Sequence, residues 1–166
     1  MGDSYKELMV KKEKGMKERF LRTLCVVLTV FVAFFWLMTQ SIVAVIALIL
    51  ICVLDYYVFQ CTDIEYEYLY LDKEISIDKI MAKTKRKQVA TLKVEKMEIL
   101  APEKSYHLDS YKNRDVKTVD YSAGQNLAEQ KLYVLYYEGN QRYLLNLDED
   151  FAKTIQGIAP RKVFMD

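Results

Sequence analysis

The chain has few of the residues that build catalytic, metal-binding or cofactor sites. It contains one histidine, three cysteines, two prolines and five glycines in 166 residues. Cys25, Cys52 and Cys61 show neither the paired spacing of metal ligands nor a disulfide framework. No glycine-rich phosphate loop, HExxH or GxSxG motif occurs. We therefore expect no catalytic residues, no metal and no cofactor, and we expect the single histidine, His107, to be a solvent-exposed bystander.

Charge is missing from one long stretch of the chain. Residues 23–54 form a run of 32 residues without Asp, Glu, Lys, Arg or His. One helix of that length would be about 48 Å long, whereas the hydrocarbon core of a bilayer is about 30 Å thick. The polar triplet Thr39-Gln40-Ser41 interrupts the run. We therefore predict a hairpin of two antiparallel membrane helices over residues 20–59, formed by 20–38 and 42–59.

The charges that flank this run predict its orientation. The first 22 residues carry seven basic and four acidic side chains. Because Lys and Arg mark the side that is not translocated, the N-terminus should be cytoplasmic. A hairpin returns the chain to the same side, so we predict a multi-pass cell-membrane protein (inner or plasma membrane) with both termini cytoplasmic. A cleaved signal peptide competes with this interpretation, but about twenty mostly polar residues precede the run and a second apolar segment follows.

Polar and aromatic residues mark the ends of the predicted hairpin. If residue 40 is the pivot, Asp55 lies only about 4.5 Å of helical rise from Arg22. We predict an Arg22–Asp55 ion pair that closes the cytoplasmic end, with proton transfer by Asp55 as the alternative. Three aromatic residues are expected in interfacial belts, namely Tyr56 and Tyr57 at the cytoplasmic end and Trp36 at the far end.

Residues 1–19 precede the hairpin as a basic leader. The pattern Ser4-x-x-Glu7 is a capping box, which predicts a helix. Two interpretations stay open, because Gly15 weakens the helix and its apolar stripe is incomplete. The helix either lies on an anionic leaflet or is a solvated leader that only fixes orientation.

After the hairpin, the apolar period changes from helical to alternating, which is typical of strands. The expected strands are residues 64–71, 74–80, 89–100, 116–121 and the two arms of a hairpin over 131–147. The apolar phase of the third strand slips after Val94, which indicates a β-bulge or sharp bend. A primed turn at Gly139-Asn140 would place Tyr136 opposite Tyr143. Acidic residues 148–150 then begin an amphipathic helix that stops at Pro160.

Six strand-like segments followed by one helix predict an α+β fold: a small, strongly bent antiparallel sheet or barrel with a C-terminal capping helix. This order, and the passage QRYLLNLDEDF from the last strand into the helix, resembles the bacterial pleckstrin-homology-like (PH-like) fold over the cytoplasmic residues 62–166. The whole chain, including IDKI and KRK, is similar to small two-span membrane proteins of anaerobic Gram-positive bacteria that have no assigned activity. The resemblance implies a binding or assembly module, by analogy of fold alone.

The segment 83–87 (KTKRK) is the strongest functional signal. A strand of eight residues travels about 26 Å from the bilayer and the next one returns, so this loop should lie near the anionic leaflet. The expected membrane-surface residues are Lys83, Lys85, Arg86 and Lys87, each contributing about 1 kcal/mol. An ordinary solvated turn is the competing interpretation. Nucleic-acid binding is not expected, because the cluster is short and the domain is nearly neutral.

Tyrosines are frequent in the predicted strands, and their role has two interpretations. They either pack the core of a small barrel, which we favour, or line a recognition surface. They are Tyr66, Tyr68, Tyr70, Tyr133, Tyr136, Tyr137 and Tyr143.

We expect an integral membrane protein whose PH-like domain is an interaction or assembly module at the cytoplasmic surface, in contact with anionic lipid headgroups and an unknown protein partner. The alternative is an accessory subunit of a transporter or cell-envelope complex, recognised through its hairpin. Small residues that permit close helix approach are scarce, which disfavours the alternative. A membrane-bound enzyme is the third hypothesis and lacks a catalytic constellation.

Overall fold

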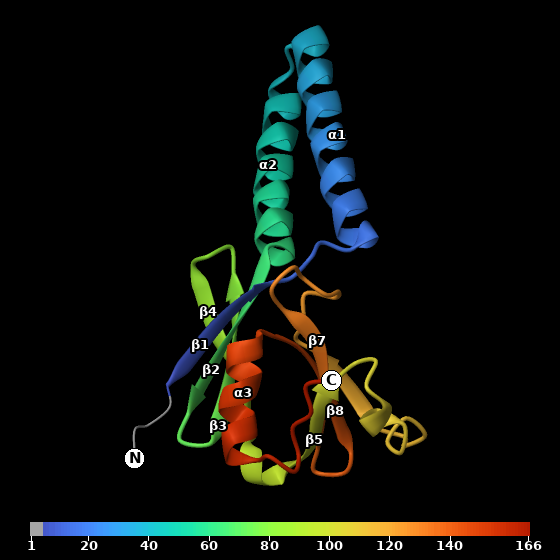
Figure 1. The fold of residues 1–166 in the computed structure, drawn as a ribbon. Coiled ribbons are helices and arrows are strands. Elements are labelled where there is room, and N and C mark those ends of the chain that lie inside the picture. Colours follow the sequence, from blue (N-terminus) through green and yellow to red (C-terminus); the bar gives the residue numbers. More distant parts are fainter. Residues whose placement is uncertain (1–4) are drawn as a thin grey trace. The chain divides into compact units, whose positions relative to one another are not determined.

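The computed structural model describes residues 5–166, which form two compact units (Figure 1). The hairpin unit comprises Lys14–Ile64 and the turn segment Met81–Lys85. The sheet unit comprises the residues up to Glu13, Glu65–Ile80 and Arg86–Asp166.

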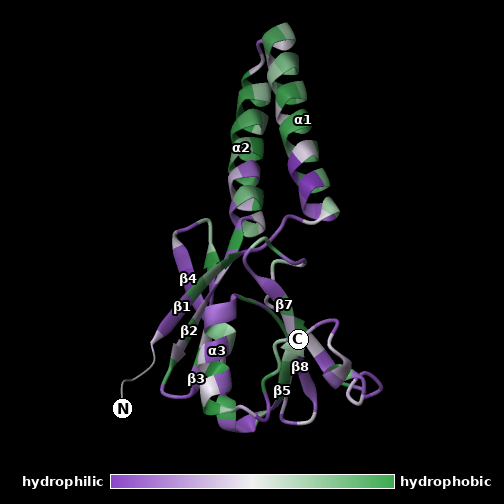
Figure 2. Cartoon of the chain, in the orientation of Figure 1, coloured by the Kyte–Doolittle hydropathy of each residue, from purple (hydrophilic) through white to green (hydrophobic). Residues whose placement is uncertain are grey.

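The hairpin unit is built from two helices, α1 (Met16–Thr39) and α2 (Ile42–Thr62). Gln40 adopts the left-handed conformation (φ 46°) that ends α1, and the Ser41 side chain accepts a hydrogen bond from the backbone N–H of Val43 to begin α2. Both helices are long and apolar enough to cross a membrane, and most of their side chains are exposed. Figure 2 shows the apolar residues along both helices, with polar residues gathered at the ends opposite the turn. The predicted helix pair and its short turn are confirmed.

The N-terminal segment differs from the expected basic helix. Lys6–Lys11 form strand β1, which pairs antiparallel with β2 (Ile64–Leu71) from Lys6 opposite Tyr70 to Lys11 opposite Glu65. Glu7 of the predicted capping box therefore lies in a strand, and Ser4 lies outside the described residues. The helix prediction was wrong because it used local spacing alone, whereas β2 supplies a partner strand from beyond the hairpin.

The sheet unit contains two four-stranded sheets. The first has the order β1-β2-β3-β4, with β3 spanning Glu74–Met81 and β4 spanning Lys85–Lys93. At the predicted phase slip, the chain makes a single turn of 3-10 helix, η1 (Val94–Lys96), and leaves this sheet. The expected third strand is therefore divided between two sheets by a sharp bend.

The second sheet has the order β5-β7-β8-β6. Its strands are β5 (Met97–Pro102), β6 (Lys117–Asp120), β7 (Lys131–Tyr137) and β8 (Gln141–Leu147), and a short 3-10 helix, η2 (Tyr106–Leu108), follows β5. Strands β7 and β8 pair with Leu135 opposite Tyr143 and Tyr136 opposite Arg142. The predicted register was wrong by one residue, because the loop consists of three residues with Glu138 and Gly139 both at positive φ.

Helix α3 (Glu149–Ile158) follows the second sheet. The Asp148 side chain accepts a hydrogen bond from the backbone N–H of Phe151 and caps the helix. The Phe151 ring is fully buried and packs edge-on against Tyr68 and Tyr70 of the first sheet. A helix pair, two sheets and a C-terminal helix confirm the predicted PH-like α+β class, with β1 as a strand that precedes the hairpin.

Candidate functional site

Arg22 organises the end of the hairpin opposite the turn. Its Nε donates a hydrogen bond to the Thr62 hydroxyl, and its Nη2 donates to the Phe59 carbonyl over 3.1 Å. The guanidinium also lies over the Phe59 ring at 4.8 Å. A cation that binds the last carbonyls of a helix satisfies groups without an intrahelical partner and complements the helix dipole. Arg22 therefore caps α2 from α1.

The predicted ion pair between Arg22 and Asp55 was wrong. Asp55 instead accepts a hydrogen bond from the Thr29 hydroxyl over 2.5 Å, and in the described part of the chain it has no cationic partner. Thr29 lies four residues, or about one turn, beyond residue 25, with which the prediction had aligned Asp55. The helices therefore pack about one turn out of the predicted register, and this separates Arg22 from Asp55 by about 10 Å along the pair.

The connection between β3 and β4 is a tight turn joined to the end of α2. The backbone N–H of Ala82 donates to the Asp63 carbonyl over 2.9 Å, and that of Thr84 donates to the Met81 carbonyl over 3.2 Å. Ala82 and Lys83 both adopt left-handed conformations, with φ of 49° and 56°. Such φ values are unfavourable for side chains that are not glycine, asparagine or aspartate. This turn holds Lys83 beside the hairpin's end.

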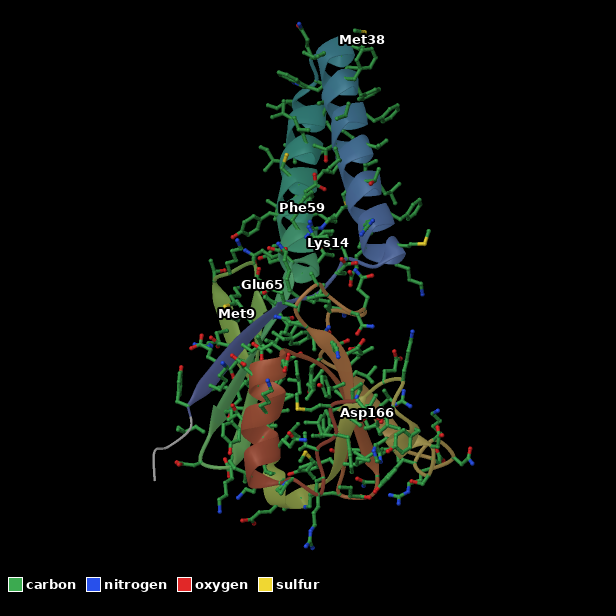
Figure 3. All side chains as sticks on the ribbon, viewed as in Figure 1. Met9, Lys14, Met38, Phe59, Glu65 and Asp166 are labelled. Atoms are coloured by element: carbon green, nitrogen blue, oxygen red, sulfur yellow. The ribbon has the colours of Figure 1, made fainter. Side chains whose placement is uncertain are left out.

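A surface pocket of about 470 Å³ lies at this end of the hairpin unit. Its lining is Lys14, Arg22, Tyr56, Phe59, Gln60, Asp63, Ala82, Lys83 and Thr84. Three basic groups thus face one acidic group, and for Lys14 and Lys83 the described residues supply no carboxylate partner. Lys14 and Phe59 lie near the same end of the helices, whereas Met38 lies at the other (Figure 3). The pocket therefore carries a net positive charge, which suits the binding of an anionic group.

The four basic residues that were predicted to contact the membrane surface, Lys83, Lys85, Arg86 and Lys87, divide into two groups. Arg86 forms ion pairs with Glu67 and with Asp78, at 2.8 Å for the latter, across the first sheet. Its charge is therefore neutralised within the sheet unit. Lys83, Lys85 and Lys87 are exposed and have no ion pair with any described residue.

The three predicted belt residues lie at opposite ends of the helices. Trp36 is one turn from the end of α1 at the hairpin's turn. Tyr56 and Tyr57 are in the last two turns of α2, where their exposed rings contact each other edge-on. Their place at a bilayer interface stays a prediction.

The seven strand tyrosines form core, as we favoured, since none of them exceeds 8% exposure. The Tyr68 hydroxyl donates to the Tyr121 carbonyl over 2.6 Å, and the Tyr137 hydroxyl accepts from the backbone N–H of Lys93. Burial raises the pKa of the Tyr68 phenol far above its ordinary value. These rings leave no open tyrosine-lined recognition surface on the sheets.

His107 is half-buried rather than solvent-exposed. Its ring stacks on Phe164 at 3.7 Å and lies 3.9 Å from the Tyr106 ring. The neighbouring Ser105 hydroxyl bonds the Asp166 carboxylate, which ties down the C-terminus. Within residues 5–166, no group of three or more His, Cys, Asp or Glu side chains could hold a metal ion.

Sequence reasoning missed six of the nine residues that line the basic pocket, among them Lys14, Phe59 and Asp63. Lys14 was counted only for its charge, and Phe59 only as the end of a helix. A usable signal existed, because a basic residue just before α1 and the end of α2 must meet at the open end of any two-helix hairpin. The return of the second strand predicted that the β3–β4 turn lies near the membrane, but its contact with the end of α2 could not be predicted, because the Ala82–Asp63 hydrogen bond is nonlocal.

Comparison with known proteins identifies the family of the chain. Residues 2–165 match the family described as bacterial PH-like domain (DUF6106), so the match includes the helix pair, both sheets and α3. No curated protein and no solved structure matches the chain. The Gram-positive, anaerobic source in the expected resemblance finds no support in these comparisons. The chain belongs to the bacterial PH-like domain family.

Proposed function

We propose that this chain is a membrane-anchored interaction module and not an enzyme. Its hairpin crosses the bilayer twice, and its PH-like sheets serve binding or assembly at the cytoplasmic surface. The proposal joins two established features, a PH-like domain and two helices that are long and apolar enough to span.

The pairing of β1 with β2 carries this proposal. The two helices stand between these strands in the sequence, and the strands are antiparallel neighbours in one sheet. Both ends of the hairpin must therefore return to the same side of any membrane that the helices enter. A single crossing would separate two paired strands by the thickness of a bilayer. This supports two crossings over one.

The distribution of charge supports a cytoplasmic sheet unit. The segment before α1 and the first two turns of α1 carry Lys11, Lys12, Lys14, Lys17, Arg19 and Arg22. The turn at the other end of the hairpin, Thr39-Gln40-Ser41, is uncharged. Because basic residues favour the side that is not translocated, the sheets would stay in the cytoplasm and only the turn would reach the far side.

The unpaired basic side chains suit an anionic leaflet. Lys14 and Lys83 line the pocket at the hairpin's open end, and Lys85 follows in the same unit. Each basic residue close to an anionic surface contributes about 1 kcal/mol of attraction. We therefore keep Lys83, Lys85 and Lys87 as proposed membrane-surface residues, add Lys14, and leave out Arg86.

Topology reporters test the proposal directly. We would fuse the full chain after Asp166 to a reporter that is active only in the cytoplasm and, separately, to one that is active only outside. The same two reporters inserted between Gln40 and Ser41 are the matched control. We expect cytoplasmic activity at the C-terminus and external activity at the turn. External activity at the C-terminus would refute the double crossing.

The accessory-subunit alternative differs in its requirement for a partner. It predicts that a second protein remains bound to the hairpin in stoichiometric amount in mild detergent. Substitutions on the exposed apolar faces of α1 and α2 would then release that protein. Purification of the chain alone, with the expected topology, would favour the proposed module.

A further inference from the structure

A second pocket adjoins the basic pocket on the surface of α2. It has a volume of about 480 Å³. Its lining is Leu48, Ile49, Cys52, Val53, Tyr56 and Tyr57. These positions recur at intervals of three and four residues, so they form one face of the helix. The small Cys52 side chain lies in the middle of this face, between larger neighbours one turn away on either side.

Tyr56 lines both pockets, so the apolar groove and the basic pocket are neighbours within the hairpin unit. From Leu48 to Tyr57 the groove extends about 14 Å along the helix. This is about half of a hydrocarbon core of about 30 Å, or the depth of one leaflet. Basic groups at the end of such a groove lie at the depth of lipid headgroups.

We infer that these two pockets together bind one anionic glycerophospholipid of the cytoplasmic leaflet. Its phosphate lies among Lys14, Arg22 and Lys83, and one acyl chain lies in the groove of α2. The inference rests on the proposed function, because only a hairpin that crosses the membrane presents the groove to lipid.

The charges of the pocket select the headgroup. Arg22 uses two N–H groups to cap α2, so its remaining donors are free to face an anion together with Lys14 and Lys83. Asp63 disfavours a second negative group and offers an acceptor for a headgroup hydroxyl. A phosphodiester with one negative charge and a hydroxylated headgroup, such as phosphatidylglycerol, fits this set better than zwitterionic phosphatidylcholine.

Lipid titration of the full chain in mild detergent, followed by native mass spectrometry, tests the inference. The probes are phosphatidylglycerol and phosphatidylcholine with identical acyl chains, and sn-glycerol 3-phosphate as a headgroup without chains. We expect one phosphatidylglycerol per chain, bound at least tenfold more tightly than phosphatidylcholine. Equal affinity for the two lipids would overturn the inference. Glycerol phosphate binding as tightly as phosphatidylglycerol would also overturn it, since it would indicate a site for free phosphate.

Two variants separate the two parts of the site. The double variant Lys14→Gln/Lys83→Gln should weaken phosphatidylglycerol binding about 30-fold, since each lysine contributes about a factor of five. Its binding of phosphatidylcholine should weaken less, because the choline cation already offsets the charge of the phosphate. A far-UV circular dichroism spectrum equal to that of the wild type would show that the variant folds. The control, Lys104→Gln/Lys117→Gln, removes two exposed lysines of the sheet unit and should bind as the wild type does.

Cys52→Phe fills the groove and should weaken binding of both lipids, with no effect of the matched exposed substitution Val27→Phe on α1. Equal effects of these two substitutions would overturn the acyl-chain site. Topology is measured separately by the reporters. Absence of selective lipid binding with a confirmed double crossing would therefore refute this inference and leave the proposed function intact.

Discussion

The Thr29 hydroxyl on α1 donates a hydrogen bond to the Asp55 carboxylate on α2 over 2.5 Å. Seven residues away along both helices, Arg22 on α1 donates to Thr62 on α2. Seven residues are about two turns, so both contacts lie on the facing sides of the helices. Two polar contacts with the same spacing fix one register in a pair whose remaining surface is almost entirely apolar.

The Thr29–Asp55 contact should appear as a coupling energy in a double-mutant cycle. Thr29→Val and Asp55→Leu each remove one partner, and the double variant removes both. We expect a coupling of about 1 kcal/mol, because hydrogen bonds between membrane helices have modest net energies. The free energy of unfolding of the full chain would be measured by circular dichroism during a titration with denaturing detergent.

Thr39→Val provides the control for this cycle. The Thr39 hydroxyl bonds the Phe35 carbonyl of its own helix and makes no contact with α2 that the structure describes. Its coupling to Asp55→Leu should therefore be near zero. A coupling as large as that of Thr29 would contradict the register proposed from the two polar contacts.

Arg86 should matter for stability rather than for membrane contact. Arg86→Gln leaves Glu67, which is only 7% exposed, without its cationic partner. An unpaired buried carboxylate is costly, and because Arg86 itself is exposed we expect a loss of about 2 kcal/mol in the free energy of unfolding. The double variant Glu67→Gln/Arg86→Gln should recover part of this loss, and Lys87→Gln should change stability by less than about 0.5 kcal/mol. An Arg86→Gln variant with unchanged stability but weaker binding to anionic vesicles would return Arg86 to the membrane-surface set.

Local sequence patterns correctly predicted those elements whose structure depends on residues close together in the sequence. The uncharged run predicted both helices of the hairpin, and alternation predicted β2 and β3 with the tyrosines inward. The slip after Val94 correctly indicated a bend, although not that the chain changes sheets there. In the strands one buried face sets the period of the apolar residues, whereas the two helices follow from the length of the uncharged run.

Pairing between distant segments could not be predicted in this way. Strand β1 forms because β2, on the far side of the hairpin, accepts it as a partner, and its own sequence also fits a helix. The basic pocket has the same origin, since Lys14, Arg22 and Lys83 come from three separate segments. The predicted Arg22–Asp55 pair was wrong by one helical turn. The position of the turn in the sequence does not determine how far one helix is shifted along the other.

Ala82→Gly should stabilise the turn that holds Lys83. Ala82 adopts a φ of 49°, a conformation that is unstrained for glycine and strained for alanine. The relief of strain exceeds the added entropy of the unfolded chain, so we expect a gain of up to about 1 kcal/mol. Ala90→Gly, in the strand β4, is the matched control and should lose about 0.5–1 kcal/mol. A loss for Ala82→Gly as large as that for Ala90→Gly, measured by thermal unfolding, would mean that the turn is not strained.

Stability of the sheet unit should fall at alkaline pH because of its buried tyrosines. Burial raises the pKa of Tyr68 above the ordinary 10.0, so the folded state holds the phenolic proton when the unfolded state has lost it. The stabilisation that Tyr68 contributes to the folded state is therefore fully present below about pH 10. It is lost as the pH rises further, at up to about 1.4 kcal/mol per pH unit. Near-UV circular dichroism of the full chain in denaturant, between pH 8 and 11, would follow this loss.

Tyr68→Phe removes the ionising group and should make the alkaline loss shallower. The loss should not vanish, because burial also raises the pKa of Tyr70, Tyr121, Tyr133 and Tyr143. At neutral pH this variant should be less stable by about 1 kcal/mol, because it lacks the hydrogen bond to the Tyr121 carbonyl. The exposed Tyr106 offers the control, since Tyr106→Phe should keep the wild-type slope. If Tyr68→Phe kept that slope too, the alkaline loss would come from groups other than Tyr68.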